Sequence, residues 1–215
     1  MPKTGKADGR RVVKARVPRM RTAFFSREIP ANLSAFSCRD RVIVERQMDK
    51  HVFDSRLVLG VSCRCRWGYP QTIACRPLYK QRPFPTLFWL TCPYLSHLCG
   101  TIESCGGVHD MEEYLAKREK SYNDYNRSYA LMRLSLLSIA EKRVLRRYMP
   151  KLWHVLIRTG IGGIAMSEKP TVKCLHLQTA AYLSLPGHPG GGWLSERIGQ
   201  FNCDNRQCHI YPRKY

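Results

Sequence analysis

A short apolar run that ends in Cys-Pro constrains the fold of this 215-residue chain more than any other feature. The run is PFPTLFWLTCPYL, residues 83–95, and residues 87–91 within it favour one β-strand. Pro93 suits the first turn of a helix, because the N–H that proline lacks is unpaired there in any case. Prolines and threonines interrupt the run, which falls short of the ~18 apolar residues that a membrane helix needs. It therefore predicts a buried strand that leads directly into a helix, with Cys92 at the junction.

Two more β-rich stretches precede this run, and they predict a small sheet. Residues 57–63 and 71–75 favour strands, and the sequence CRWGYP between them supplies a turn. Residues 40–48 favour a short helix. We therefore expect a small antiparallel sheet with Cys63, Cys65 and Cys92 at strand ends or in turns.

Helical patterns dominate the second half of the chain. Leu95, Leu98, Cys99 and Ile102 follow helical spacing up to the glycines at 106–107. Asp110 and Glu113 have the spacing of a capping box. From residue 111 to 139, large apolar residues and tyrosines recur every three or four positions, which predicts one long helix that ends by Pro150, with a single break allowed. We interpret this tyrosine and methionine stripe as core, and Cys99 as core as well.

Beyond Pro150 the pattern is shorter and more varied. Residues 151–158 are apolar, TGIGG is a predicted loop, residues 171–183 favour another helix, and LPGHPGGGW is a predicted loop. The predicted fold class is α+β: a small antiparallel sheet packed by several helices, one of them long.

The chain divides into three parts by composition. Residues 39–199 are expected to form a single domain, and residues 200–215 a tail that contains cysteines. Residues 1–38 carry nine Lys or Arg against two acids without hydrophobic periodicity, which predicts a disordered basic arm. An organelle transit peptide and a true start at Met20 or Met48 are the alternatives. Because no apolar segment follows the first charges, a secretory signal is not expected and the expected location is cytoplasmic.

The formal net charge of +20 raises the question of a polyanionic partner. Outside the arm the charge is scattered, with one dense patch at Lys142, Arg143, Arg146 and Arg147. Scattered charge usually marks a solvated surface, so nucleic-acid binding is an alternative function. Aromatic residues near basic ones support that alternative: Trp67, Tyr69, Tyr79 and Phe84. The pattern does not indicate an oligomeric state.

Several motifs taken together resemble the bacterial domain-of-unknown-function 501 family over roughly residues 39–199. They are CRWGYP, PFPTLFWLTCPYL, TIESCGG, GIGGI and VKCLH. The resemblance implies no established activity. It does imply family cysteines at Cys65 and Cys92, and a cysteine and histidine at Cys174 and His176. The chain departs from the family where Gly187-His188-Pro189-Gly190 replaces Asn-Pro-x-Gly.

Three cysteines and a histidine from separate segments suit a metal centre. Cys65, Cys92, Cys174 and His176 match a tetrahedral zinc site, and three thiolates also suit an iron–sulfur cluster. Cys63, Cys203 and Cys208 are weaker candidates. A helix N-terminus lowers the pKa of a thiol, which favours ligand roles for Cys92 and Cys174 over simple packing. Two positions apart on a helix, Cys174 and His176 point apart, so they share a metal only if the helix is not yet formed at Cys174.

A cysteine-dependent enzyme of unknown reaction is the second alternative, with Cys92 or Cys174 as nucleophile and His176 as base. Other catalytic signatures are poor. The glycine-rich stretches lack the Lys-Ser/Thr of a phosphate loop, and neither G-x-S-x-G nor H-E-x-x-H occurs. Glu103, Glu112 and Glu113 are interpreted as helix-surface or helix-start charges.

Overall fold

The computed structural model describes residues 33–48, 53–79, 82–84, 86–167 and 169–210. The predicted arm lies outside these residues up to position 32, and the end of the tail lies outside them from position 211. Within the described residues, every helix is too short or too polar to pass through a lipid bilayer.

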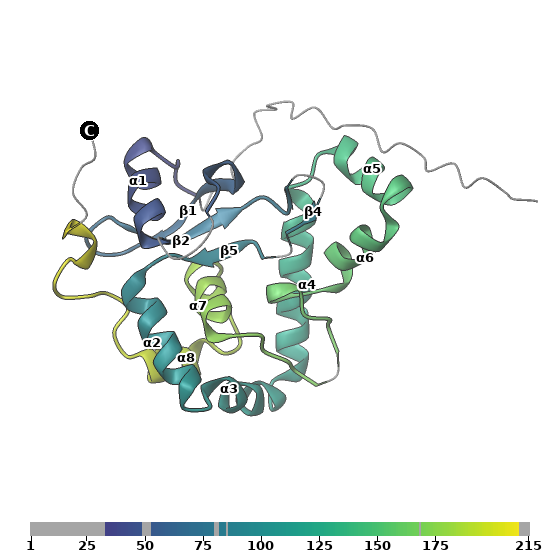
Figure 1. The fold of residues 1–215 in the computed structure, drawn as a ribbon. Helices are drawn as coiled ribbons and strands as arrows, with labels where there is room; N and C mark the ends of the chain where they lie inside the picture. Colours follow the sequence, from purple (N-terminus) through teal and green to yellow (C-terminus); the bar gives the residue numbers. More distant parts are fainter. Residues whose placement is uncertain (1–32, 49–52, 80–81, 85, 168, 211–215) are drawn as a thin grey trace, which may run out of the picture.

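The sheet has three antiparallel strands in the order β1-β2-β5, and it confirms the predicted α+β class (Figure 1). The strands are β1 Val58–Arg64, β2 Pro70–Cys75 and β5 Phe88–Leu90. The turn between β1 and β2 contains Gly68, whose φ of 81° is the left-handed conformation that glycine adopts readily. Two short strands, β3 Leu78–Tyr79 and β4 Arg82–Pro83, form a separate ribbon.

Opposite faces of the sheet pack against different helices, because side chains alternate along a strand. Ile73 and Cys75 of β2 lie with Val44 of helix α1 Cys38–Gln47. Ala74 of β2 and Phe88 of β5 lie in the main core, which includes helix α7 Leu175–Ser184. Figure 1 shows α1 above the sheet and α7 below it. All six residues of β2 are buried, as expected for a central strand covered on both faces.

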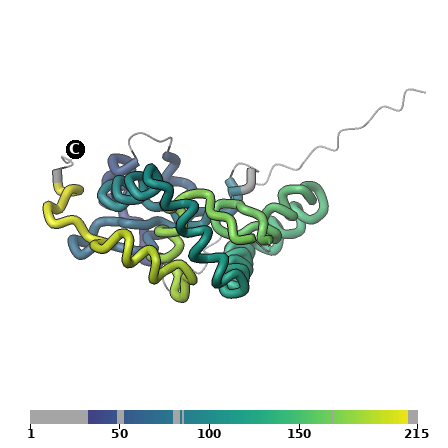
Figure 2. Tube along the Cα trace, turned by 90° about the horizontal axis from the view of Figure 1, so that it is seen from below, coloured from purple at the N-terminus to yellow at the C-terminus, as the bar shows by residue number. Residues whose placement is uncertain are grey.

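Helices α2, α3, α4 and α8 lie around α7, while α5 and α6 extend the molecule to one side (Figure 2). Their bounds are α2 Pro93–Ser104, α3 Gly107–Ala116, α4 Glu119–Ser135, α5 Ile139–Tyr148, α6 Pro150–Arg158 and α8 Gly191–Ile198. Three short 3₁₀ turns complete the described elements: Ser55–Leu57, Ile161–Gly163 and Gln207–Ile210. Figure 2 shows α5 and α6 at one end and the C-terminal segment at the other.

The predicted long helix is confirmed as α4 of 17 residues, but the predicted segment is divided into three helices. It breaks near Lys117, where α3 ends, and again before Ser138, whose side chain caps α5. The predicted capping box at Asp110 is wrong, because α3 already begins at Gly107. Tyr122, Tyr129 and Met111 are buried as predicted, whereas Ile139 is 78 % exposed at the start of α5.

Two boundaries in the last third of the chain also differ from prediction. Helix α7 begins at Leu175 and not at Thr171. The last three residues of the predicted loop LPGHPGGGW form the first turn of α8, and His188 in this loop is buried. Both differences arise from tertiary contacts that periodicity does not report.

Candidate functional site

The candidate site lies where α2 crosses the start of α7. Ser96, Cys99 and Glu103 recur at steps of three and four residues, so they share one face of α2. Cys99 is fully buried, as predicted, and its sulfur lies 3.4 Å from the hydroxyl of Thr179 on α7. One turn further along, Glu103 reaches the beginning of α7. The crossing therefore places the carboxylate of Glu103 beside Cys174 and His176.

Two glutamates hold the segment that leads into α7. Glu112 accepts a hydrogen bond from the backbone N–H of Val172 at 2.8 Å. Glu103 accepts one from the N–H of Leu175 at 2.5 Å, which is one of the unpaired donors at a helix N-terminus. An acidic group at this end of a helix is favourable because it faces the positive end of the helix dipole.

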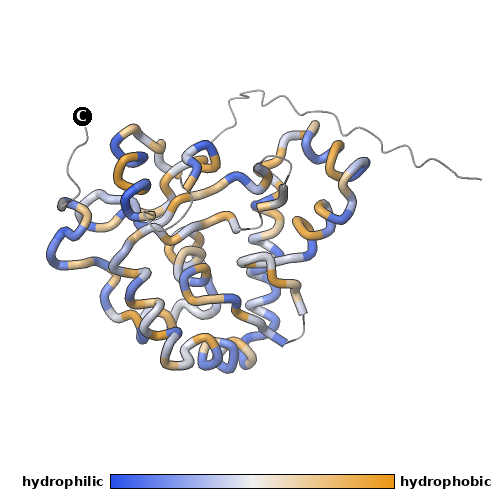
Figure 3. The backbone as a smooth tube through the Cα atoms, in the orientation of Figure 1, coloured by the Kyte–Doolittle hydropathy of each residue, from blue (hydrophilic) through white to orange (hydrophobic). Residues whose placement is uncertain are grey.

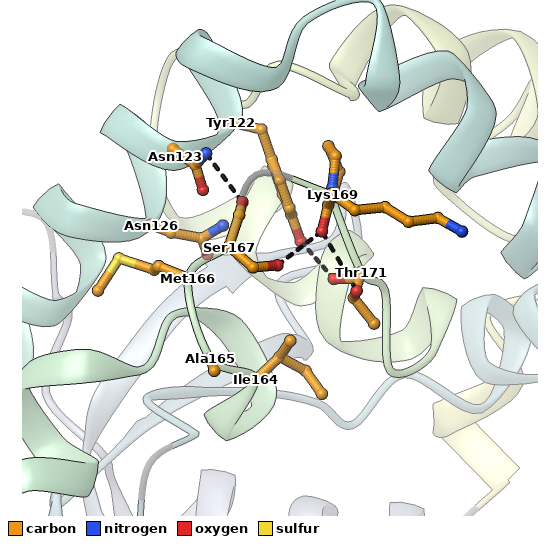
Figure 4. Close-up of a pocket in the computed structure, with 10 residues that line it drawn as sticks. Tyr122, Asn123, Asn126, Ile164, Ala165, Met166, Ser167, Lys169 and Thr171 are labelled. Carbon is orange, nitrogen blue, oxygen red and sulfur yellow. Dashed lines mark hydrogen bonds between the residues drawn. The ribbon is translucent and has the colours of Figure 1, made fainter.

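The segment before α7 also packs against α4. Asn123 of α4 donates to the carbonyl of Ser167 at 3.1 Å, and Tyr122 donates to the carbonyl of Thr171 at 3.3 Å (Figure 4). The cavity between them has a volume of about 10 Å³, enough for about one water molecule. This contact therefore fixes the approach to Cys174 and does not form a ligand pocket.

Cys174 is the residue before the first turn of α7, in an extended conformation with φ −167° and ψ 158°. Cys174 and His176 would point apart if both were in the helix. Cys174 precedes the helix, however, and His176 is inside it. Their side chains therefore reach the same place. One ligand atom from each of Glu103, Cys174 and His176 lies within 4.8 Å of the other two. Across the described residues, no other group of three such side chains meets this condition.

Both ring nitrogens of His176 face oxygen acceptors. Nδ1 lies 3.0 Å from Oε1 of Glu103, and Nε2 lies 3.1 Å from the backbone carbonyl of Ser96. The Cys174 side chain and the Glu103 carboxylate together raise the pKa of His176 to about 9, against the opposite effect of partial burial. The ring is therefore protonated at neutral pH in the metal-free protein, and a proton occupies the Nδ1 position between His176 and Glu103.

This charge state bears on the predicted cysteine-dependent enzyme. A general base must have a free nitrogen to accept the proton of the thiol. A protonated His176 remains compatible with that role, because in a cysteine–imidazolium pair the histidine has already accepted the proton of the thiol. The same position between His176 and Glu103 could instead exchange its proton for a cation.

Cys65 and Cys92 lie elsewhere, near each other and near Cys208 of the C-terminal segment, since Cys208 and Cys65 both act electrostatically on the thiol of Cys92. Cys65 follows β1 and packs in one apolar cluster with Tyr69 and Cys208. The tail is held there by Trp67, which donates to the carbonyl of Cys203 at 2.8 Å. The structure thus divides the four predicted ligands between two places, Cys174 and His176 at one and Cys65 and Cys92 at the other.

Cys92 is at the N-terminus of α2, as predicted, but its chemistry differs from the prediction. Burial raises its pKa to about 12, while the backbone N–H groups of Leu95 and Tyr94 have the opposite, weaker effect. In the metal-free protein the loss of hydration at Cys92 thus outweighs the effect of the helix N-terminus on its pKa, opposite to the expected direction. Burial likewise raises the pKa of Cys63 and of Cys208.

Residues 61–196 match the family model described as "Protein of unknown function (DUF501)", which is more than half of the chain. The chain belongs to the DUF501 family. No curated protein and no solved structure matches it. The segment shared with DUF501 includes Glu103, Cys174 and His176, whereas Cys203 and Cys208 lie beyond its end.

Glu103 is the residue of the site that sequence reasoning missed. Its interpretation as a surface charge rested on its place near the end of a helix, yet its side chain is only 24 % exposed. A usable signal was its position in the TIESCGG motif, seven residues after Ser96 and four after the core residue Cys99. That spacing places it on the buried face of α2.

Proposed function

We propose that this DUF501 protein binds a zinc ion through Glu103, Cys174 and His176. The observation that carries the proposal is the approach of three different ligand atoms to within 4.8 Å of one another. Two members of the predicted set, Cys174 and His176, are retained. Glu103 takes the place of Cys65 and Cys92, which lie in the other group of cysteines.

The hydrogen bond from His176 to Ser96 supports this role. A histidine that binds a metal commonly donates its other N–H to a backbone carbonyl or a carboxylate, which fixes the ring and its tautomer. Nε2 of His176 donates to the Ser96 carbonyl, so Nδ1 is the nitrogen that faces Glu103 and Cys174. On His176, zinc would replace the proton on Nδ1 and keep the Ser96 hydrogen bond, while Cys174 would bind the ion as a thiolate.

The donor set also indicates which metal is favoured. Sulfur, imidazole nitrogen and carboxylate oxygen are the three ligand types that zinc accepts, whereas magnesium and calcium prefer oxygen alone. A single cysteine in the group favours zinc over an iron–sulfur cluster, which several thiolates usually hold. Zinc–ligand bonds near ~2.0–2.3 Å place tetrahedral ligands roughly 3.5 Å apart, so small side-chain rotations suffice.

Three protein ligands leave one position of a tetrahedral zinc ion for water or a substrate atom, as in catalytic sites. His176 and Glu103 are 35 % and 24 % exposed, so this position is accessible from solvent. A bound zinc ion would supply Lewis-acid chemistry there. The residues of the chain would hold the ion, and Ser96 would orient His176.

The competing interpretation is purely structural. Glu103 caps α7 and pairs with charged His176, and these contacts help to join α2 to α7 without any metal. A structural pair requires no metal, so metal content of the protein separates the two interpretations.

The test is to purify the full chain without chelators, measure zinc by mass spectrometry, and then titrate the chelated protein with Co²⁺. We expect about one zinc per chain, and a thiolate-to-cobalt charge-transfer band that is lost in Cys174→Ser. Glu103→Gln and His176→Gln should weaken cobalt binding by at least about tenfold, since each removes one of three ligands. Matched controls on exposed positions are Cys105→Ser, His97→Gln and Glu113→Gln.

A protein that folds without zinc and shows no cobalt band would overturn the proposal. Loss of the band in Cys65→Ser or Cys92→Ser, with Cys174→Ser unaffected, would move the metal to the other group of cysteines.

A further inference from the structure

Besides the proposed zinc site, helix α5 presents a positively charged face that could bind a ligand. Ile139, Lys142, Arg143, Arg146 and Arg147 follow one another at steps of three, one, three and one residues, which places them on one side of the helix. The three arginines are exposed. Together these five residues line a hollow in the surface. We call the four cations the α5 stripe.

The helix that carries the α5 stripe is well packed and capped. On the other side of α5, Leu145 is fully buried with Leu137 and Leu156. Ser138 and Glu141 form a complete capping box at its start. The helix is therefore fixed by its own cap and by its apolar side, and the stripe points away from the core.

No carboxylate in the described part of the chain neutralises the charge of the stripe. Among the residues that the structure describes, no acid forms an ion pair with any of its four cations. Glu141, the one acid between residues 139 and 158, is bonded to Ser138, while that segment contains six Lys or Arg residues. Arg146 is additionally held over the ring of Trp153 of α6, 4.5 Å from the ring centre. Four cations held this close together repel one another unless an anion lies between them.

The chemistry of the stripe indicates the anion. Three of its four members are arginines, whose planar fork matches phosphate oxygens in a bidentate way. From Lys142 to Arg147 the helix advances by about 8 Å, which corresponds to two or three successive phosphates along one nucleic-acid strand. A membrane surface is a poorer match, since a helix that lies in a bilayer needs its own free apolar face, and the apolar side of α5 around Leu145 is buried in the protein, which leaves mainly Ile139 exposed.

We propose that the α5–α6 hairpin binds the phosphate backbone of a nucleic acid through Lys142, Arg143, Arg146 and Arg147. The hairpin protrudes from the molecule at a distance from the α2–α7 crossing, and Figure 3 shows hydrophilic segments along α5. Binding through phosphates alone positions a protein without reading sequence. This surface therefore acts independently of the proposed zinc site.

The test compares two variants of the full chain with equal net charge. The stripe variant replaces Lys142, Arg143, Arg146 and Arg147 with glutamine. The control variant replaces four exposed cations of the α3–α4 region with glutamine: Lys117, Arg118, Lys120 and Arg127. Fluorescence anisotropy with a 20-base-pair duplex, as DNA and as RNA, gives the dissociation constant between 50 and 200 mM salt. Circular dichroism shows whether each variant retains its helices.

Each phosphate contact contributes about 0.9 to the slope of log affinity against log salt on duplex DNA. We expect the stripe variant to flatten that slope by about 3, which corresponds to roughly 60-fold over a fourfold change in salt. The control variant should keep the wild-type slope. Replacing Arg143, Arg146 and Arg147 with lysine should keep the salt slope, which depends on charge, and weaken binding at a fixed salt concentration, because lysine lacks the bidentate fork.

An equal loss in the stripe and control variants would overturn the proposal, because it would show only the effect of net charge. Absence of duplex binding by the wild-type chain would overturn it too. Vesicles that contain phosphatidylserine serve as a third probe, and binding to vesicles without binding to either duplex would assign the stripe to a membrane surface instead.

Discussion

Arg133 shows how much a single buried residue contributes to this fold. Its side chain is completely buried in α4, and burial lowers its pKa to about 10, so it stays charged at neutral pH. It donates to the carbonyls of Leu156 at 3.1 Å, Thr159 at 2.5 Å and Gly160 at 3.3 Å. These carbonyls lie at the C-terminal end of α6, where a positive charge is favourable. One guanidinium thus joins α4 to α6 and to the glycine-rich loop.

Arg133→Met should therefore destabilise the protein strongly. The substitution leaves several buried carbonyls without donors, and each unpaired group costs about 1–3 kcal/mol. We expect the free energy of unfolding in urea to fall by at least about 2 kcal/mol. Arg127→Met on the same helix is the matched control, since Arg127 is 68 % exposed and should change stability by less than about 0.5 kcal/mol. Equal effects of the two substitutions would contradict the role of Arg133.

Individual residues of the site differ in how far the sequence predicts them. Cys174 and His176 could be predicted because they are close in sequence and a thiol and an imidazole are characteristic metal ligands. Glu103 could not be assigned in this way, because its role depends on the crossing of α2 with α7, some 70 residues along the chain. Cys65 and Cys92 carry the same chemistry as Cys174, so residue type alone could not show that they lie in another group.

At the scale of elements, local patterns predicted the existence of helices and strands better than their ends. The three strands and α1, α2 and α7 all occur where the sequence indicates them. The start of α7 was placed four residues too early, because apolar periodicity does not report that Glu112 accepts a hydrogen bond from Val172 before the helix begins. The break before α5 did have a local signal: Ser138 and Glu141 have capping-box spacing, which the continuous stripe of large residues concealed.

In the glycine-rich loop after α6, Gly162 and Gly163 have positive φ, whereas Gly160 is required by a close approach of the backbone to α4. Gly160 lies directly against the side chain of Asn126 of α4, so a Cβ at position 160 would overlap it. Asn126 is 5 % exposed, and its side-chain oxygen accepts a hydrogen bond from the N–H of Ile161 at 3.0 Å. The loop is thereby fixed on α4 at the point where the chain turns toward Cys174.

Gly160→Ala should accordingly break this contact and destabilise the protein by roughly 1–3 kcal/mol, as overpacking of a closed site does. Gly100→Ala provides a control with the opposite sign. Gly100 is inside α2, and a Cβ added there would meet open space, so alanine should add stability by about 0.5–1 kcal/mol. Thermal or urea unfolding measures both. A stabilised Gly160→Ala protein would show that the loop does not need the Asn126 contact.

At the scale of the whole molecule, the two proposed activities occupy separate regions of one packed domain. The α2–α7 crossing belongs to the main core under the sheet, whereas the α5 stripe belongs to a hairpin with its own small apolar cluster around Leu145. Zinc removal should therefore leave duplex binding unchanged, and the stripe substitutions should leave metal content unchanged. The main core also encloses His188, which takes part in neither proposed activity.

His188 is held neutral in the main core. Its Nε2–H donates to the side-chain oxygen of Gln178 at 2.9 Å, and its Nδ1 accepts from the N–H of Gly190 at 3.0 Å. The rings of Tyr125 and Tyr182 enclose it, and neither carries a charge in acid. Burial lowers the pKa of His188 to about 4. The ring is therefore protonated only near pH 4 in the folded protein, whereas in the unfolded chain it is protonated near pH 6.5.

The protein should consequently lose stability as the pH falls from about 6.5, the unfolded pKa of histidine, to about 4, the folded pKa of His188. Over that interval the unfolded chain binds one more proton, and the difference corresponds to roughly 3 kcal/mol. In His188→Gln the amide can still donate to Gln178 but cannot titrate. We expect this variant to be less stable at pH 7 and to lose less stability than the wild type between pH 6.5 and 4. Urea unfolding of the metal-free protein at several pH values tests this, and identical pH profiles for the two proteins would show that His188 is not the residue that titrates.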